Sequence, residues 1–160
     1  MVTTRPAAPS DAAELAELLN AIIVRGGTTA FETPFSPGGL SEAYLLGPTA
    51  HCCFVAEADG RIAGFQTLGT QPFLPAHIGD IATFTRLGST QSGVGTALFA
   101  ATTARVRELG LTAINATIRA DNSGGLTFYT RMGFIDYEIV RGVPLKNGTP
   151  VDRIRKRFAL

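Results

Sequence analysis

The chain has 160 residues, of which 45% are hydrophobic and 17% are charged, and its formal net charge is +1. This length suits one domain, residues 1–160, and the composition excludes a disordered chain. The near-neutral charge argues against a nucleic-acid partner held by bulk electrostatics. No apolar run approaches the length of a membrane span, and residues 1–6 lack the apolar segment of a signal peptide. We therefore expect a cytoplasmic protein without a membrane partner.

The first 68 residues predict a strand, two helices and a hairpin. A short strand is expected over 3–5, and Ser10 is expected to cap a helix that ends before residue 26. The apolar face of this helix comprises Leu15, Leu18, Leu19 and Ile22. After a turn-rich stretch, a short helix is expected over 41–46. Strands over 51–58 and 61–68 form a hairpin across Asp59-Gly60, a dipeptide suited to positive φ.

The remaining elements alternate strand and helix before a final pair of strands. We expect a strand ending near residue 85, a helix from about 95 to 109, a strand over 112–118, a helix over 122–132, and strands over 134–140 and 151–158. The apolar stripe of the first of these helices comprises Leu98, Phe99, Val106 and Leu109. A strand–helix–strand crossover implies parallel neighbours, and the hairpin implies antiparallel ones. The prediction is an α/β fold with a mixed, mostly antiparallel sheet and helices on both faces.

Two polar features have simple structural interpretations. Cys52 and Cys53 are adjacent on a strand and are interpreted as buried free thiols, with neither a disulfide nor a metal site. The period of a strand puts Arg153, Arg155 and Arg157 on one face. We interpret that face as solvated. Recognition of a substrate carboxylate by one of these arginines is the alternative.

The most informative segment is the strand–turn–helix at residues 81–98. Gly93 and Gly95 open its helix, where unpaired N–H groups and the helix dipole favour an anion such as a phosphate. The segment is not a Walker A loop, because Gly95 is followed by Thr96 rather than Lys, and Leu98 breaks the dinucleotide fingerprint. A plain glycine-rich turn remains the alternative.

A second segment, residues 122–134, supports a functional interpretation. Asp121 or Asn122 can cap its helix, and Gly133 can end it. Tyr129 lies two helical turns after Asn122, so the amide and the phenol share one face. The alternative is that Tyr129 is an ordinary core aromatic residue.

Together the two segments resemble the GNAT superfamily of acyl-CoA-dependent N-acyltransferases. That family carries Gln/Arg-x-x-Gly-x-Gly/Ala at the start of its central helix and, about thirty residues later, Asn-x-x-Ala-x-x-x-Tyr followed by Gly-Phe. The matching residues here are Gly93, Gly95, Asn122, Tyr129, Gly133 and Phe134. Thr90 departs from the usual Gln or Arg, and Gly125 departs from the usual Ala.

The resemblance implies acetyl-CoA as co-substrate and no metal. It also implies that the fourth and fifth strands of the sheet splay apart to admit the cofactor. The implied cofactor-binding residues are Thr83, Phe84, Thr85, Thr90, Gln91, Ser92, Gly93, Val94, Gly95, Thr96 and Asn122.

In this family an amine attacks the thioester directly, and the resemblance gives Tyr129 the role of proton donor to the leaving thiolate. Backbone N–H groups near Thr83 to Thr85 are the implied donors to the developing oxyanion. Within the superfamily the chain looks closest to the phosphinothricin acetyltransferase-like branch, whose His-x-x-Glu pattern is matched by His77 and Asp80. Asp80 is then the predicted base, direct or through water, because a free amine must lose a proton before it attacks.

Alternative bases are His77, Glu32 and His51, and Phe31, Glu32 and His77 are predicted to contact the acceptor. The predicted function is acetyl transfer to a small amine, such as an amino acid or an amino-acid-like antimetabolite. A non-catalytic CoA-binding or sensor domain of the same fold is the rival. A homodimer is expected from the resemblance alone.

Overall fold

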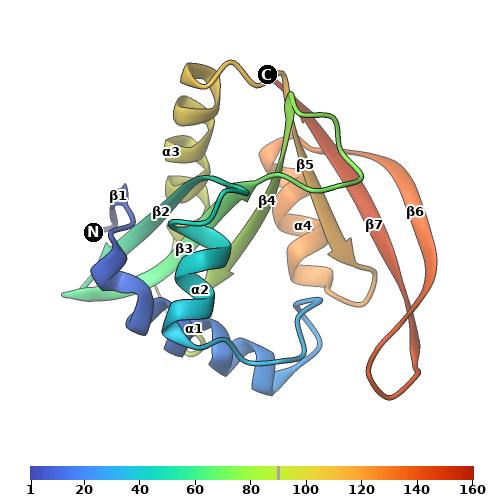
Figure 1. The fold of residues 1–160 in the computed structure, drawn as a ribbon, viewed down its shortest axis with the longest axis horizontal. Coiled ribbons are helices and arrows are strands. Elements are labelled where there is room, and N and C mark those ends of the chain that lie inside the picture. The colour runs from blue at the N-terminus through green and yellow to red at the C-terminus, as the bar shows by residue number, and fades with distance from the viewer. Residues whose placement is uncertain (90) are drawn as a thin grey trace.

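A seven-stranded sheet forms the centre of the computed structural model, which describes residues 1–89 and 91–160 (Figure 1). The strand order is β1-β2-β3-β4-β5-β7-β6, and only the β4–β5 pair is parallel. The strands are β1 (Thr3–Pro6), β2 (Ala50–Ala58), β3 (Arg61–Gly69), β4 (Ile78–Thr85), β5 (Ala113–Arg119), β6 (Ile135–Pro144) and β7 (Pro150–Ala159). The predicted mixed, mostly antiparallel sheet is confirmed.

Helices cover both faces of this sheet. They are α1 (Ala12–Arg25), α2 (Pro37–Tyr44), α3 (Val94–Glu108) and α4 (Ser123–Met132). On one face α1 and α2 pack on β2, β3 and β4 around Phe65 and Phe84. On the other face α3 and α4 pack around Leu68 and Ile114. Alternating strand residues therefore enter two separate apolar cores, as the period of a strand requires.

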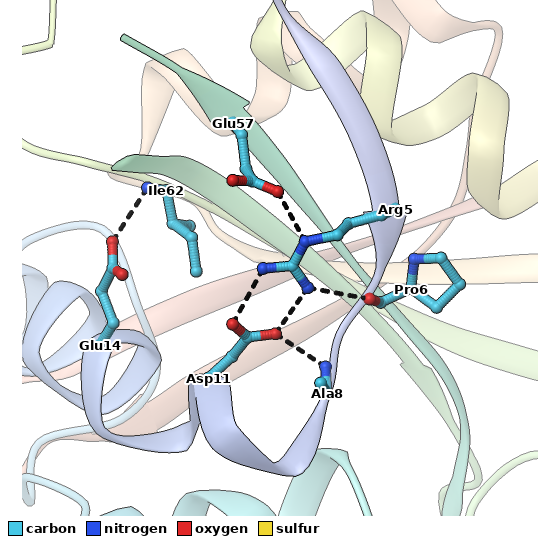
Figure 2. Close-up of polar contacts among 7 residues, drawn as sticks. All are labelled: Arg5, Pro6, Ala8, Asp11, Glu14, Glu57 and Ile62. Carbon is cyan, nitrogen blue, oxygen red and sulfur yellow. Dashed lines mark hydrogen bonds and ion pairs between the residues drawn. The ribbon is translucent and has the colours of Figure 1, made fainter. Parts of the chain in front are cut away.

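The start of α1 differs from the sequence expectation. Ser10 lies in a short 3₁₀ turn, Pro9–Asp11, and Asp11 is the N-cap residue of α1. The carboxylate of Asp11 is occupied elsewhere: it accepts from the Ala8 backbone N–H at 2.7 Å and from both terminal nitrogens of Arg5 at 2.8 and 2.9 Å (Figure 2). Arg5 also donates to Glu57 at 2.6 Å. These bonds join β1, β2 and the start of α1, and no local pattern predicts them.

The second helix also begins earlier than predicted. Ser36 caps α2 by accepting from the Gly39 N–H at 3.0 Å, and Pro37 occupies the first helical position, where its missing N–H has no consequence. Asn20 of α1 exchanges two 2.8 Å hydrogen bonds with the backbone of Phe35. These bonds fix the end of the α1–α2 loop, residues 26–36. The predicted stripe of α3 is wrong at its end, because Leu109 is 37% exposed.

The parallel strands β4 and β5 separate after only a short paired stretch. Their last paired residues are Asp80 and Asn115, although β4 continues to Thr85 and β5 to Arg119 (Figure 1). This divergence matches the splay that the family resemblance implies. The Arg86 N–H donates to the Ala63 carbonyl of β3 at 2.8 Å. Since antiparallel hydrogen bonds alternate, the backbone groups of Thr83 and Thr85 point away from β3, toward β5.

Candidate active site

A buried chain of polar groups connects β3, β4 and α4. The Tyr129 hydroxyl lies 2.8 Å from Thr83 Oγ1, which also accepts from Gln66 Nε2 at 2.9 Å. Tyr129 is 6% exposed, and burial raises its pKa, opposed by hydrogen bonds from Thr83. Tyr129 is therefore protonated at neutral pH. Sequence reasoning missed Gln66, because its contact with Thr83 depends on the register of β3 against β4.

Asn122 holds the beginning of α4. Its Oδ1 accepts from the Gly125 N–H at 3.0 Å, and its Nδ2 donates to the Thr28 carbonyl of the α1–α2 loop at 2.9 Å. The helix ends at Gly133, whose φ is 107°. A Cβ at Gly125 would lie 2.5 Å from Asn122 Nδ2, so glycine at this position leaves room for the capping amide. The cap and C-terminal glycine predicted from sequence are confirmed, and Asn122 has the additional task of anchoring a loop.

The glycine-rich segment forms the N-terminus of α3. Gly93 is the N-cap residue, with φ of 81°, a left-handed conformation that favours glycine. The N–H groups of the first turn have no intrahelical acceptor, so this end of the helix can bind an anion. Val94 is buried, whereas Ser92, Gly93 and Thr96 are exposed.

Gly95 has a packing role. A Cβ there would lie 2.6 Å from Cε1 of Phe128, so the absent side chain lets α3 approach α4. Gln91 lies just before this turn, and its N–H is 3.3 Å from Ser89 Oγ. Thr90, also predicted to bind the cofactor, lies outside the described residues.

Asp80 lies on the opposite face of β4 from Thr83. It lines a cavity of about 120 Å³ together with Phe31, Tyr44 and Gln71. Burial raises the pKa of the Asp80 carboxyl, while hydrogen bonds from Asn115 and Gln71 and the charge of Arg155 oppose the rise. A carboxylate with a raised pKa is a stronger base than an exposed one.

Asn115 of β5 connects Asp80 to β6. Its Nδ2 donates to Asp80 Oδ1 at 2.9 Å, and its Oδ1 accepts from the Tyr137 hydroxyl. Asn115 is fully buried, so both bonds orient the amide in an environment without competing water. Arg157 lies over the ring of Tyr137, 4.2 Å from its centroid. Asn115 and Tyr137 were not found from sequence, since they contact Asp80 only through strand pairing.

The three residues predicted to contact the acceptor lie in different parts of the structure. The Phe31 ring packs edge-on against Phe35 at 5.2 Å and lines the cavity with Asp80. Glu32 is turned toward the β6–β7 turn, where its carboxylate accepts from the Lys146 N–H at 2.9 Å. His77 is exposed at the paired end of β4 and is not among the cavity-lining residues. The structure thus brings Phe31, but not His77, to the cavity of Asp80.

The arginine face of β7 is not the solvated surface expected from sequence. Arg153 is only 8% exposed, because β5, β6 and the neighbouring strand residues surround it. Arg155 lies 3.9 Å from the ring centroid of Phe73, which covers part of its guanidinium. Simple alternation predicts which residues share a face, but it does not predict what covers that face.

Comparison with known proteins identifies the class. The model of the Acetyltransferase (GNAT) family matches residues 21–134, and the chain belongs to this family. No curated protein matches the chain by sequence.

Solved structures of acetyltransferases share the fold along nearly the whole chain. A phosphinothricin acetyltransferase from Sinorhizobium meliloti, in complex with acetyl-CoA, has a TM-score of 0.86 at 19% identity and covers 99% of this chain and 88% of its own. A ribosomal-protein-alanine N-acetyltransferase from Brucella melitensis has a TM-score of 0.83 at 20% identity and covers 99% of each chain. An N-acetyltransferase from Staphylococcus aureus Mu50 has a TM-score of 0.87 at 17% identity and covers 99% of this chain and 98% of its own. The names of the first two neighbours give different acceptors, so the likeness indicates a common fold and not a common substrate.

Within residues 1–89 and 91–160, no helix has both the length and the apolar character needed to span a membrane. The same ranges contain no group of three or more His, Cys, Asp or Glu side chains that could hold a metal ion.

Proposed function

We propose that this chain transfers the acetyl group of acetyl-CoA to the amine of a small molecule, an amino acid or a compound resembling one. The observation that carries the proposal is the arrangement at the divergence of β4 and β5. Tyr129 and Thr83 supply a hydroxyl pair on one face of β4, and Asp80 supplies a partly buried carboxylate on the other. The family match supports acetyl transfer, and the Sinorhizobium meliloti neighbour supports acetyl-CoA as the donor.

The residues present fit acetyl-CoA. The first-turn N–H groups of Val94, Gly95 and Thr96 suit a pyrophosphate, and the left-handed Gly93 lets the chain turn close to it. The backbone groups of Thr83 and Thr85 point toward β5 and suit the amide groups of the pantetheine arm and the acetyl carbonyl. When bound, acetyl-CoA supplies an acetyl thioester that a neutral amine attacks.

Tyr129 is the proposed proton donor to the leaving thiolate. Thr83 Oγ1 accepts from Gln66, so its own proton is free to be donated to the Tyr129 oxygen. In this arrangement the Tyr129 proton points away from Thr83 and is available for transfer. Gln66 is a positioning residue, because it acts on the Tyr129 hydroxyl only through Thr83 Oγ1.

Asp80 is the proposed acceptor of the amine proton. Free amines have pKa values of about 8 to 10, so a base raises the fraction of reactive amine at neutral pH. Asn115 holds Oδ1 of Asp80, and the carboxyl also lines the cavity. The short aspartate side chain favours transfer through one water molecule.

The test measures thiol release from acetyl-CoA and acetylated product by mass, with a panel of amines. Tyr129→Phe removes one hydroxyl, and we expect kcat to fall on the order of 10²-fold with little change in acetyl-CoA affinity. Thr102→Val is the matched control, since in the described part of the chain the Thr102 hydroxyl is buried without a hydrogen bond. Wild-type kcat in Tyr129→Phe, at a pH where chemistry limits the rate, would remove Tyr129 from the mechanism.

The same panel of amines distinguishes an acetyltransferase from a non-catalytic sensor domain. A non-catalytic sensor domain would bind acetyl-CoA in calorimetry and release no thiol with any amine. An enzyme releases thiol and acetylated product in equal amounts.

A further inference from the structure

The face of β7 that carries Arg153, Arg155 and Arg157 continues the face that carries Asp80. Arg157 is opposite Asn115, which bonds to Asp80. Arg155 is opposite Thr117, and Arg153 is opposite Arg119. The arginines therefore follow β5 from the level of Asp80 into the region where β4 has diverged. In the described part of the chain, the helices of this face, α1 and α2, pack mainly on β2, β3 and β4.

The neighbours of Arg153 have partners. Arg119 donates to both oxygens of Asp121, at 2.9 and 2.7 Å, and to the Thr29 carbonyl at 3.2 Å. Arg155 pairs with Glu138, and its guanidinium lies over the Phe73 ring. These groups meet the usual requirement that a buried charge be paired.

Arg153 is the most buried of the three arginines on this face. Among the described residues its Nη1 is buried and makes no hydrogen bond, as is also true of Nε of Arg155 and Nε of Arg157, and no carboxylate pairs with its guanidinium. Its cross-strand neighbour is a second cation, Arg119. The nearby acids are engaged elsewhere, Asp121 with Arg119 and Glu32 with the Lys146 N–H. Burial and the charge of Arg119 lower the pKa of Arg153, and the charges of Asp121 and Glu32 oppose this shift without reversing it.

We propose that Arg153 binds a carboxylate carried by the acceptor, so that the substrates are amino acids and not simple amines. This inference rests on the proposed function, because it assigns a second contact to the same acceptor. An arginine fork matches a carboxylate in two parallel hydrogen bonds, and the anion would also offset the charge of Arg119. The α1–α2 loop, bonded to Arg119 through Thr29, borders this site and would cover the bound carboxylate.

The distance between Arg153 and Arg157 along β7 is relevant to the length of the acceptor. Positions 153 and 157 of β7 are four residues apart, which is about 13 Å along a strand. Arg153 is thus farther along the diverging strands than the Asp80–Asn115 pair. With its carboxylate at Arg153, an acceptor would present its amine to the gap between β4 and β5 through its own carbon chain. α-Amino acids and ω-amino acids share this chemistry, and the experiment distinguishes them.

The experiment compares kcat/KM for carboxylates and their primary amides. The probes are the standard L-amino acids, β-alanine and 4-aminobutyrate, each beside its amide. We expect wild-type enzyme to prefer the carboxylate by about 10- to 100-fold, the range of a charge-assisted hydrogen bond. Arg153→Gln should remove the preference by raising KM for the acid while leaving the amide unchanged. Arg141→Gln is the matched control, because the Arg141 side chain is 76% exposed and pairs only with Asp152.

Each outcome is decisive. If wild-type enzyme has the same kcat/KM for an acid and its amide, the carboxylate site is overturned and the proposed function still stands. The same conclusion follows if Arg153→Gln lowers kcat/KM equally for the acid and the amide. If Arg153→Gln does not fold, Arg153→Lys keeps the charge without the fork and should lose part of the preference; an unchanged preference counts against the site. If no amine is acetylated, the proposed function fails. Calorimetry with N-acetyl-L-amino acids then tests the carboxylate site alone, and binding must weaken in Arg153→Gln for the site to stand.

Discussion

One face of the sheet has two halves with opposite chemistry. Over β2, β3 and β4 the inward residues, such as Val55 and Phe65, are apolar and covered by α1 and α2. Over β5 and β7 the residues of the same face are polar, with Asn115 and Arg153 among the most buried, and within residues 1–89 and 91–160 the helices α1 and α2 pack mainly on the other half (Figure 1). Asp80 lies at the boundary.

This contrast suggests that the apolar half mainly stabilises the fold, whereas the polar half mainly serves function. In the apolar half, burial stabilises the fold, and helices can cover the sheet because most of the side chains there need only apolar packing. In the polar half, each side chain needs a hydrogen-bond partner, and the available partners include a ligand. We therefore expect substitutions in the two halves to affect different quantities.

The largest effect is expected in the apolar half. Phe65→Ala should lower the free energy of unfolding by about 3–5 kcal/mol, because Phe65 is fully buried against Phe84. Folded Phe65→Ala should retain KM for the acceptor. Val24→Ala, at a position that is 79% exposed, should change the free energy of unfolding by less than about 0.5 kcal/mol. Denaturant titration measures the free energy of unfolding of both variants. A large change in the acceptor KM of folded Phe65→Ala would show that the two halves do not act separately.

At the boundary, Asp80→Asn should lower kcat/KM on the order of 10²-fold at pH 6–7, with recovery at higher pH where solution deprotonates the amine. Because the folded pKa of Asp80 is raised, the wild-type acid limb should lie above the usual aspartate pKa of about 4 and should disappear in the variant.

The same raised pKa gives a stability prediction. The contribution of Asp80 to stability is fully present below the unfolded pKa of about 3.9 and is lost as pH rises through the higher folded pKa. Asp80→Asn should therefore melt at a higher temperature than wild type at neutral pH, with the difference shrinking in acid. A lower melting temperature together with a rate defect independent of pH would assign Asp80 a structural role.

In the polar half, Tyr137→Phe should lower the free energy of unfolding by about 1–3 kcal/mol, because the buried Asn115 carbonyl loses its donor. The acid limb of kcat/KM should also move, since Asn115 holds Asp80. Tyr44→Phe is the control, at a phenol that lines the same cavity. A pH profile identical to wild type in Tyr137→Phe would show that Asn115 does not need Tyr137 to orient Asp80.

The smallest effect concerns two adjacent glycines at the start of α4. A Cβ at Gly124 meets only Asn122 Oδ1, at 3.8 Å, so Gly124→Ala should raise the free energy of unfolding by up to about 1 kcal/mol. Gly125→Ala should lower it, because its Cβ would lie 2.5 Å from Asn122 Nδ2 and displace that amide from the Thr28 carbonyl. Thermal melts of both variants test the pair. Equal shifts would mean that the Asn122 cap tolerates a side chain at Gly125.

The sequence by itself determined the order of helices and strands, the glycine-initiated helix at Gly93 and the cap of α4 at Asn122. These features depend on interactions between residues within a few positions of one another, so composition and spacing reveal them. The family motif likewise places Tyr129 on α4, because the motif is also a pattern of residues within a few positions of one another.

The tertiary structure decided which residues contact one another. Ser10 lies in a 3₁₀ turn and Asp11, which is bonded to Arg5, is the N-cap residue of α1 instead. The contact of Gln66 with Thr83 depends on how β3 pairs with β4. The burial of Arg153 depends on strands on both sides of β7. Such contacts join residues that are distant in the chain, and their free energy depends on strand register and burial, which no local pattern specifies.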